Sequence, residues 1–322
     1  MQTAMKGLIA RICFLLAMLS ASASTVCGQD AILSQFFSSP TYMNPAFAGT
    51  GAGYRMVLNF RSHPFPDASN FSTLNAAVDV YAPTLSGGLG LLVNSDYLGN
   101  MAYKNHIDAI YAYHLQLSQN WQLNFGMQAG YYRTDLRWGN LEFTDPSQPP
   151  PEQDHRHAPN FGAGLLVYGD WLYGGLATHH LTRPPEGFYG DQRLPMKHTA
   201  HAGIYLQPNP VRRANTLLFD YFVSPNVIFQ SQGPFQRINY GLYLGIESVM
   251  AGAWFRHDLD NANQLIFLVG LTLDNIRIGY SYDHSLSGYS DAFNGIHEIS
   301  LSYSIFSARQ KLRERIIRCP QF

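Results

Sequence analysis

The chain is 322 residues long, with 13% charged residues, 14% aromatic residues and a net charge of -1. Soluble globular proteins carry about 25% charged residues, so this composition argues against an ordinary soluble surface. The mean hydropathy of -0.13 is too polar for a bundle of membrane helices, and the near-neutral charge gives no sign of a nucleic-acid partner. Few charges with many aromatics fit a membrane barrel whose strands alternate lipid-facing and lumen-facing residues.

Residues 1–28 have the pattern of a signal peptide. Lys6 and Arg11 form a basic start, and the apolar run Ile12–Leu19 is too short to span a bilayer as a helix. Cleavage after Gly28 is preferred over cleavage after Ala23, because Gln29 then begins the next segment.

The cysteines leave two alternatives open. Cys27 raises the hypothesis of a lipoprotein, which Val26 disfavours because a small residue is expected before a lipidated cysteine. Cleavage after Gly28 leaves Cys319 as an unpaired thiol, whereas cleavage after Ala23 allows a tie between Cys27 and Cys319.

The segment 29–52 differs from the rest of the chain. It contains prolines and bulky aromatics but no alternation of polar and apolar residues. If this segment were exposed in the periplasm, its apolar side chains would favour aggregation. We therefore expect it to fold into the barrel or across its periplasmic mouth.

From 53 to 306 the chain consists of segments of about ten residues with period-two alternation. In Trp121–Tyr132, for example, Leu123 and Phe125 point one way while Asn124 and Gly126 point the other. The predicted strands are 53–62, 71–82, 87–97, 103–118, 120–135, 159–169, 171–182, 197–207, 213–223, 235–247, 249–258, 263–273, 275–285 and 295–306. The fold predicted is an all-β, antiparallel, up-and-down outer-membrane barrel of about fourteen strands, and an even count puts both termini in the periplasm.

A soluble β-sandwich is the alternative, and the two strand faces argue against it. The apolar face carries Tyr and Phe near segment ends, as aromatic girdles at membrane interfaces do. The opposite face is small and polar, rich in Gly, Ser, Asn and Gln. A sandwich would carry more Lys and Glu on its outer face.

The connections suggest an orientation. Short ones stand at Ser118–Asn120, Gly169–Asp170, Glu247–Ser248 and Asp274, whereas Arg137–Ala158 and Thr182–Met196 are long and are expected to be surface loops. After the last strand, the basic tail 307–322 alternates Arg and Lys with apolar residues and is expected to lie in the periplasm.

The chemistry-bearing motifs are weak. Asp154, His155 and His157 could form a metal site, but a polar loop is the favoured interpretation. His179 and His180 are expected to point to opposite faces of a strand. No nucleophile, zinc-protease or phosphate-loop motif is present in the sequence, so we expect no enzyme activity, no metal and no cofactor.

Charged residues on the predicted lumen face are more informative. They are Arg55, Arg61, Asp79, Asp108, Arg237, Glu247, Arg277, Asp283 and Glu298, and the neutral Asn59 shares the face of Arg55 and Arg61 on the first strand. Isolated charges in a narrow interior are costly, so an internal salt-bridge network is expected. A lumen that binds a polypeptide is the functional alternative.

The segment before the first strand carries a family resemblance. Ser34-Gln35-Phe36-Phe37-Ser38-Ser39-Pro40, followed by Asn44-Pro45-Ala46-Phe47-Ala48-Gly49, resembles the N-terminal signature of the PorP/SprF family of Bacteroidetes outer-membrane proteins. Gly279–Asp283, Gly295–Leu301 and the closing Cys319–Phe322 resemble other parts of that family. The loop Arg137–Ala158 is longer and richer in proline than the family pattern, so the resemblance does not determine which partner this chain binds.

The resemblance implies an outer-membrane component of type IX secretion and, in gliding bacteria, of motility. It implies as partners a secreted surface adhesin with a type IX sorting domain, other secretion components and a periplasmic, peptidoglycan-associated protein. The candidate partner-binding residues are Phe36, Phe37, Pro40, Asn44, Pro45, Phe47, Asp283, Glu298, Arg313 and Arg315. The leading hypothesis is a non-enzymatic barrel that docks, retains or helps export the adhesin. A passive pore for small solutes and a structural part of the secretion motor are the alternatives.

Overall fold

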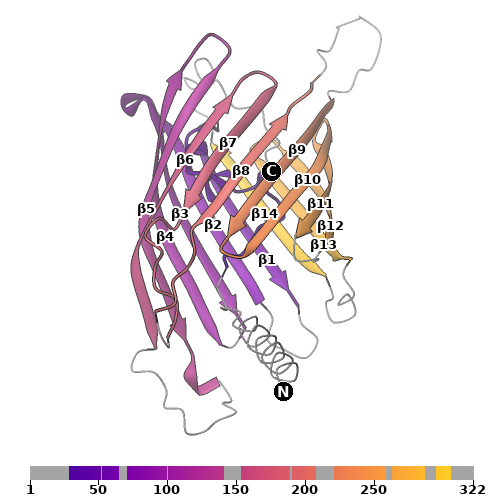
Figure 1. The fold of residues 1–322 in the computed structure, drawn as a ribbon. Helices are drawn as coiled ribbons and strands as arrows, with labels where there is room; N and C mark the ends of the chain where they lie inside the picture. Colours follow the sequence, from indigo (N-terminus) through magenta and orange to yellow (C-terminus); the bar gives the residue numbers. More distant parts are fainter. Residues whose placement is uncertain are drawn as a thin grey trace, which may run out of the picture.

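The computed structural model describes residues 29–51, 53–64, 71–99, 101–140, 154–188, 191–207, 221–258, 263–286 and 295–305. Its strands form a closed, antiparallel barrel in which every strand pairs with its neighbours in sequence, and β1 pairs with β14 (Figure 1). No helix among these residues is both long and apolar enough to cross a membrane.

The barrel has fourteen strands, which confirms the predicted architecture. They are β1 Tyr54–His63, β2 Phe71–Ala82, β3 Gly87–Leu98, β4 Ala102–Gln116, β5 Gln122–Leu136, β6 His155–Tyr168, β7 Leu172–His179, β8 Lys197–Ile204, β9 Tyr221–Gln232, β10 Phe235–Ile246, β11 Val249–Asp258, β12 Gln264–Leu273, β13 Ile276–Ser285 and β14 Ile296–Ile305. The short helices are α2 Pro40–Met43, η1 Pro45–Phe47, η2 Pro83–Leu85 and η3 Trp138–Asn140.

Alternation separates the two faces of the wall. Along β5, Phe125 and Met127 are exposed on the outside while Asn124 and Gln128 are buried inside. The same rule gives the barrel a continuous apolar exterior, as a strand needs where it faces lipid.

The strand predicted at 213–223 is wrong in position, because β9 spans Tyr221–Gln232. Pro225 interrupts the sequence pattern, since proline cannot donate a ladder hydrogen bond. In the barrel it lies where the β8 ladder ends, one residue beyond the last pair Gly203–Asn226, so the missing donor is tolerated. Similarly, β6 begins at His155, so the last residues of the predicted loop Arg137–Ala158 belong to a strand.

The barrel has two mouths that differ in their connections. At the first mouth, Tyr54 of β1 pairs with Ile305 of β14, and tight turns join β10 to β11 and β12 to β13. Asp274 and Glu247 adopt left-handed backbone conformations there, with φ values of 51° and 52°, as two-residue hairpin turns require. At the second mouth, where β1 ends at His63, most connections are longer.

Candidate functional site

The residues before β1 cross the lumen and fill it. This segment, Gln29–Gly51, is called the plug below. Asp30 lies at the second mouth, where its backbone N–H donates to Gln232, and Gly49 lies near the first mouth beside Asp79. An even strand count does put the start of β1 and the end of β14 at the same mouth. Gln29 nevertheless lies at the opposite mouth from Ile305. Residues 1–28 and 306–322 lie outside the described residues, so the periplasmic location of both termini stays a prediction.

The plug is compact because prolines and local side chains organise its turns. Pro40 opens α2, where its missing N–H costs nothing. The Asn44 side chain caps η1 by accepting a hydrogen bond from Ala46 N at 2.9 Å. The Thr50 hydroxyl donates to Phe47 O at 2.6 Å. These turns and caps satisfy several backbone polar groups of the plug without a sheet partner.

Aromatic residues hold the middle of the plug. Phe36 packs on Trp254 with ring centroids 4.6 Å apart, and Phe37 meets Tyr173 and Tyr243 edge-on at 5.7 and 6.1 Å. All five side chains are buried. The lumen wall is therefore apolar at this level, whereas the alternation indicated a small polar lumen throughout.

A charged cluster surrounds Ser34. Its backbone N–H donates to Glu298 at 2.6 Å, and its hydroxyl donates to Asp283 at 2.5 Å. Arg61 bonds both carboxylates, at 3.1 Å to Asp283 and 3.3 Å to Glu298, and Arg256 bonds Asp283 at 3.2 Å. The internal ion-pair network expected from the sequence is present here, and the plug is part of it.

A second ion pair fixes the plug near the first mouth. Arg55 and Asp79 are both buried and lie 2.8 Å apart. Asp79 also accepts from Gly49 N at 2.8 Å, and Arg55 donates to Phe47 O at 3.2 Å. Because both charges are paired and hydrogen-bonded to the plug, loss of either partner would leave a costly buried ion.

Asp30 anchors the plug at the second mouth. Its carboxylate lies 2.7 Å from His180 Nε2 and 3.5 Å from Lys197 Nζ. Burial pushes the pKa of Asp30 upward, but the neighbouring His180 and Lys197 outweigh burial and hold the pKa well below its usual value. The carboxylate therefore stays ionised and bound.

Glycines in the wall allow the plug backbone to come close. A Cβ on Gly88 would lie 2.0 Å from Ala48 O, and one on Gly126 would lie 2.2 Å from Ala46 N. A Cβ on Gly164 would lie 2.0 Å from the Asn44 side chain. Larger residues at these positions would exclude the plug, so the wall and the plug fit each other in shape.

Comparison with known proteins identifies the family. The family model described as type IX secretion system membrane protein PorP/SprF matches residues 26–303. This chain belongs to the PorP/SprF family. The predicted resemblance is confirmed, and a family of secretion membrane proteins together with the closed barrel and its apolar exterior places the protein in the outer membrane.

Solved structures that resemble the PorP/SprF barrel share little sequence with it. The outer-membrane protein Omp33 of Acinetobacter baumannii is 8% identical, with a TM-score of 0.46 over 79% of this chain and 100% of that chain. The toluene transporter TbuX of Ralstonia pickettii is 9% identical, with a TM-score of 0.47 over 85% and 95%. A FadL homologue of Pseudomonas aeruginosa is 10% identical, with a TM-score of 0.46 over 84% and 95%. No curated protein matches the chain.

The motifs that carry the PorP/SprF resemblance converge in space. The N-terminal signature is the plug itself. The Gln35 side chain donates to Glu298 O at 2.9 Å, and its Oε1 lies against Gly279. Residues from three separate stretches of the sequence therefore meet at Ser34 and Gln35. The fourth stretch, Cys319–Phe322, lies outside the described residues.

The candidate partner-binding residues fall into two groups. Phe36, Phe37, Pro40, Asn44, Pro45, Phe47, Asp283 and Glu298 are all buried in the lumen. They contact other parts of the same chain, so partner binding through them stays a prediction that needs the plug to move. Arg313 and Arg315 lie outside the described residues, as do the signal peptide, Cys27 and Cys319.

Two sequence predictions about single residues are wrong. Glu247 is exposed in the β10–β11 turn and does not face the lumen. His179 and His180 do not point to opposite faces, because β7 ends at His179 and the left-handed φ of 58° at His180 turns its ring inward. Both rings are buried: His179 contacts Met43 O at 3.3 Å, and His180 contacts Asp30.

The remaining charged positions lie on the inner face or close to it. Asp108 is buried, and Arg237 pairs with Asp258 at 3.1 Å. Arg277 is half-buried on the polar face of β13. Arg256 and Asp258 are also buried on the inner face; they are not among the predicted lumen charges, although alternation along β11 places them on that face.

The histidine-rich segment at the start of β6 is half-buried to exposed. The His155 and His157 rings stack with centroids 5.8 Å apart, and His155 contacts Asp154 at 2.9 Å. Among the residues that the structure describes, no group of three or more His, Cys, Asp or Glu side chains is arranged to hold a metal ion.

Proposed function

We propose that this PorP/SprF barrel is a non-enzymatic docking protein that retains or helps export one cognate secreted surface protein of the adhesin type. Family membership supports a role in type IX secretion. The observation that favours docking over conduction is the plug, which fills the lumen and is bound at both ends and in the middle. A filled barrel offers its loops and mouths to a partner.

The connections favour an orientation for docking. Outer-membrane barrels have short periplasmic turns and longer surface loops. By that rule the second mouth faces the cell surface and receives the secreted protein, while the first mouth and the basic tail face the periplasmic machinery. A structural link to a peptidoglycan-associated protein would act at that periplasmic side.

Deletion of the gene tests the proposal. We expect one surface adhesin to disappear from the cell surface while other type IX substrates are still exported, as measured by surface proteolysis and mass spectrometry of the shed peptides. Unchanged surface proteins would contradict docking. Loss of every substrate would instead support the structural part of the secretion motor.

A further inference from the structure

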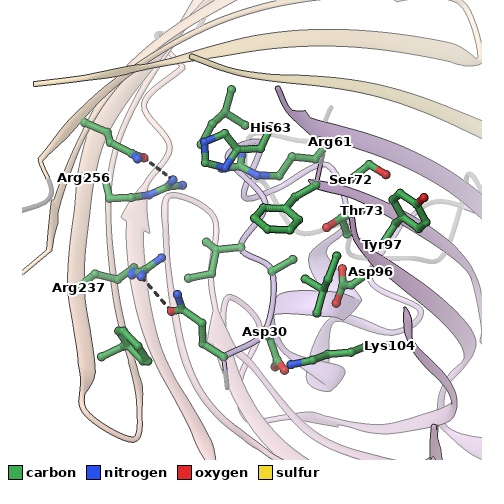
Figure 2. Close-up of a pocket in the computed structure, with 18 of the residues that line it drawn as sticks. Asp30, Arg61, His63, Ser72, Thr73, Asp96, Tyr97, Lys104, Arg237 and Arg256 are labelled. Carbon is green, nitrogen blue, oxygen red and sulfur yellow. Dashed lines mark hydrogen bonds between the residues drawn. The ribbon is translucent and has the colours of Figure 1, made fainter. Parts of the chain in front are cut away.

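A cavity of about 570 Å³ lies at the second mouth, at the point where the plug begins. The plug contributes Gln29–Ile32 to its lining, and the ends of strands on both sides of the β1–β14 seam contribute the rest. Figure 2 shows Arg237 and Arg256 on one wall and Thr73, Asp96 and Tyr97 on the other. Ligand sites in proteins have volumes of this order, about 300–1,000 Å³.

The cationic side chains of this lining are already paired. Arg61 and Arg256 bond Asp283, and Arg237 bonds Asp258. Lys104 bonds Glu186, which lies outside the cavity lining. These groups therefore offer little to an anionic ligand, because each would first have to give up an ion pair with a buried or half-buried carboxylate.

Asp96 differs from the other acidic residues of the lining. Asp30 is paired with His180 and Lys197, and Asp258 with Arg237. Asp96 is 7% exposed, and Thr73 and Asn94 hydrogen-bond its carboxylate. Its Oδ1, however, has no hydrogen-bond partner, and no ion pair is formed by Asp96 among the described residues. Lys104 stands opposite Asp96 in the β3–β4 register, yet its ammonium group is held by Glu186.

A buried carboxylate oxygen without a partner is unfavourable, and such groups in native proteins call for an explanation such as a ligand. Aromatic side chains line the same cavity, namely Phe71, Tyr97 and Phe235. A Lys or Arg side chain combines an apolar stem, which packs on aromatic faces, with a charged end that pairs with a carboxylate. The lining has both complementary features.

We propose that this cavity receives a Lys or Arg side chain at the tip of a polypeptide loop of the docked secreted protein, with Asp96 as its ion-pair partner. The inference rests on the proposed docking function and adds the chemistry by which the partner is held. The cavity exceeds the size of one side chain, so the tip of a loop enters together with the basic residue.

Binding of a hexalysine peptide to the purified full-length barrel in detergent tests the site directly. We expect Asp96→Asn to weaken this binding about tenfold or more, since a buried charge pair would lose one partner. Asp96→Glu should retain most of the binding. Asp191→Asn removes an exposed carboxylate outside the cavity lining and serves as the control. Equal hexalysine binding by the wild type and Asp96→Asn, or equally strong binding of hexaglutamate, would overturn the proposal.

An experiment in cells distinguishes failure of this inference from failure of the docking function. Asp96→Asn is expected to lower the surface level of the same protein that gene deletion removes, with an unchanged amount of folded barrel on gels. If deletion removes a surface protein but Asp96→Asn retains it in full, the assignment of Asp96 is wrong and docking stands. If deletion removes none, the docking function itself is wrong.

Discussion

Gly126 is a residue at which the barrel wall nearly touches the plug. A Cβ there would lie 2.2 Å from Ala46 N, which is backbone and cannot rotate away. We expect Gly126→Ala to lower the free energy of unfolding by about 1–3 kcal/mol through overpacking, measured by urea unfolding in detergent. Gly139→Ala, where nothing lies within 4 Å of the added carbon, is the matched control. Equal unfolding midpoints for the two variants would contradict the close fit.

Asp30 makes the attachment of the plug at the second mouth depend on pH. Its folded pKa is held well below the ordinary value of about 3.9 by His180 and Lys197, although burial opposes them. A depressed pKa contributes stability that is complete above the unfolded pKa and is lost as the pH falls through the folded pKa. A nitroxide label at Ala31→Cys should therefore stay immobile from about pH 7 to about pH 4 and become mobile only in stronger acid.

The Asp30→Asn variant tests the cause of that immobility. Without the carboxylate, the label at position 31 should be mobile across the whole range. A label that stays immobile in Asp30→Asn would mean that packing of the plug alone fixes this end.

At the scale of elements, the plug decides whether the barrel conducts ions. The wild-type protein should be silent in planar bilayers, because the plug packs against aromatic and charged residues across the lumen. Deletion of residues 31–48 should produce steady open channels. Replacement of the same residues by a Gly-Ser stretch of equal length should conduct with more noise. Conductance of the wild type equal to that of the deletion would favour the passive pore instead.

The strands were predictable because alternation repeats within each of them and needs no partner to be seen. β9 was misplaced because Pro225 breaks the local pattern, and only the end of the neighbouring β8 ladder explains why proline fits there. The tertiary role of the plug was harder to predict from the sequence. Its prolines and aromatics indicated burial, but the route across the lumen depends on glycines from distant strands, such as Gly88 and Gly164.

At the scale of the whole molecule, the two ends of the described chain lie at opposite mouths. With Cys27 and Cys319 replaced by Ser, Ala31→Cys should react with a membrane-impermeant maleimide on intact cells. Ser248→Cys, in the β10–β11 turn at the first mouth, should react only after the outer membrane is permeabilised. The reverse pattern would invert the orientation, and labelling of both sites on intact cells would contradict the crossing of the lumen by the plug.

The interior shows what a single sequence cannot specify. Arg55, Asp79, Asp283 and Glu298 were correctly expected to face the lumen, because alternation determines the face of a strand residue. Which charges pair depends on how far opposite walls stand from each other and from the plug. Alternation also places Trp254 and Tyr243 on the inner face. There they form an apolar cluster with Phe36 and Phe37, and no local sequence pattern reveals where those two plug residues lie.

The crossing of the lumen by the plug also constrains the order of assembly. The plug leads into β1 at the first mouth, and β1 forms the seam with β14, the last strand of the barrel. If the seam closed first, the N-terminal segment would have to thread through a finished ring whose wall leaves it almost no clearance. Closure around a plug that is already in place avoids this step. We therefore expect the plug to be enclosed before β1 pairs with β14.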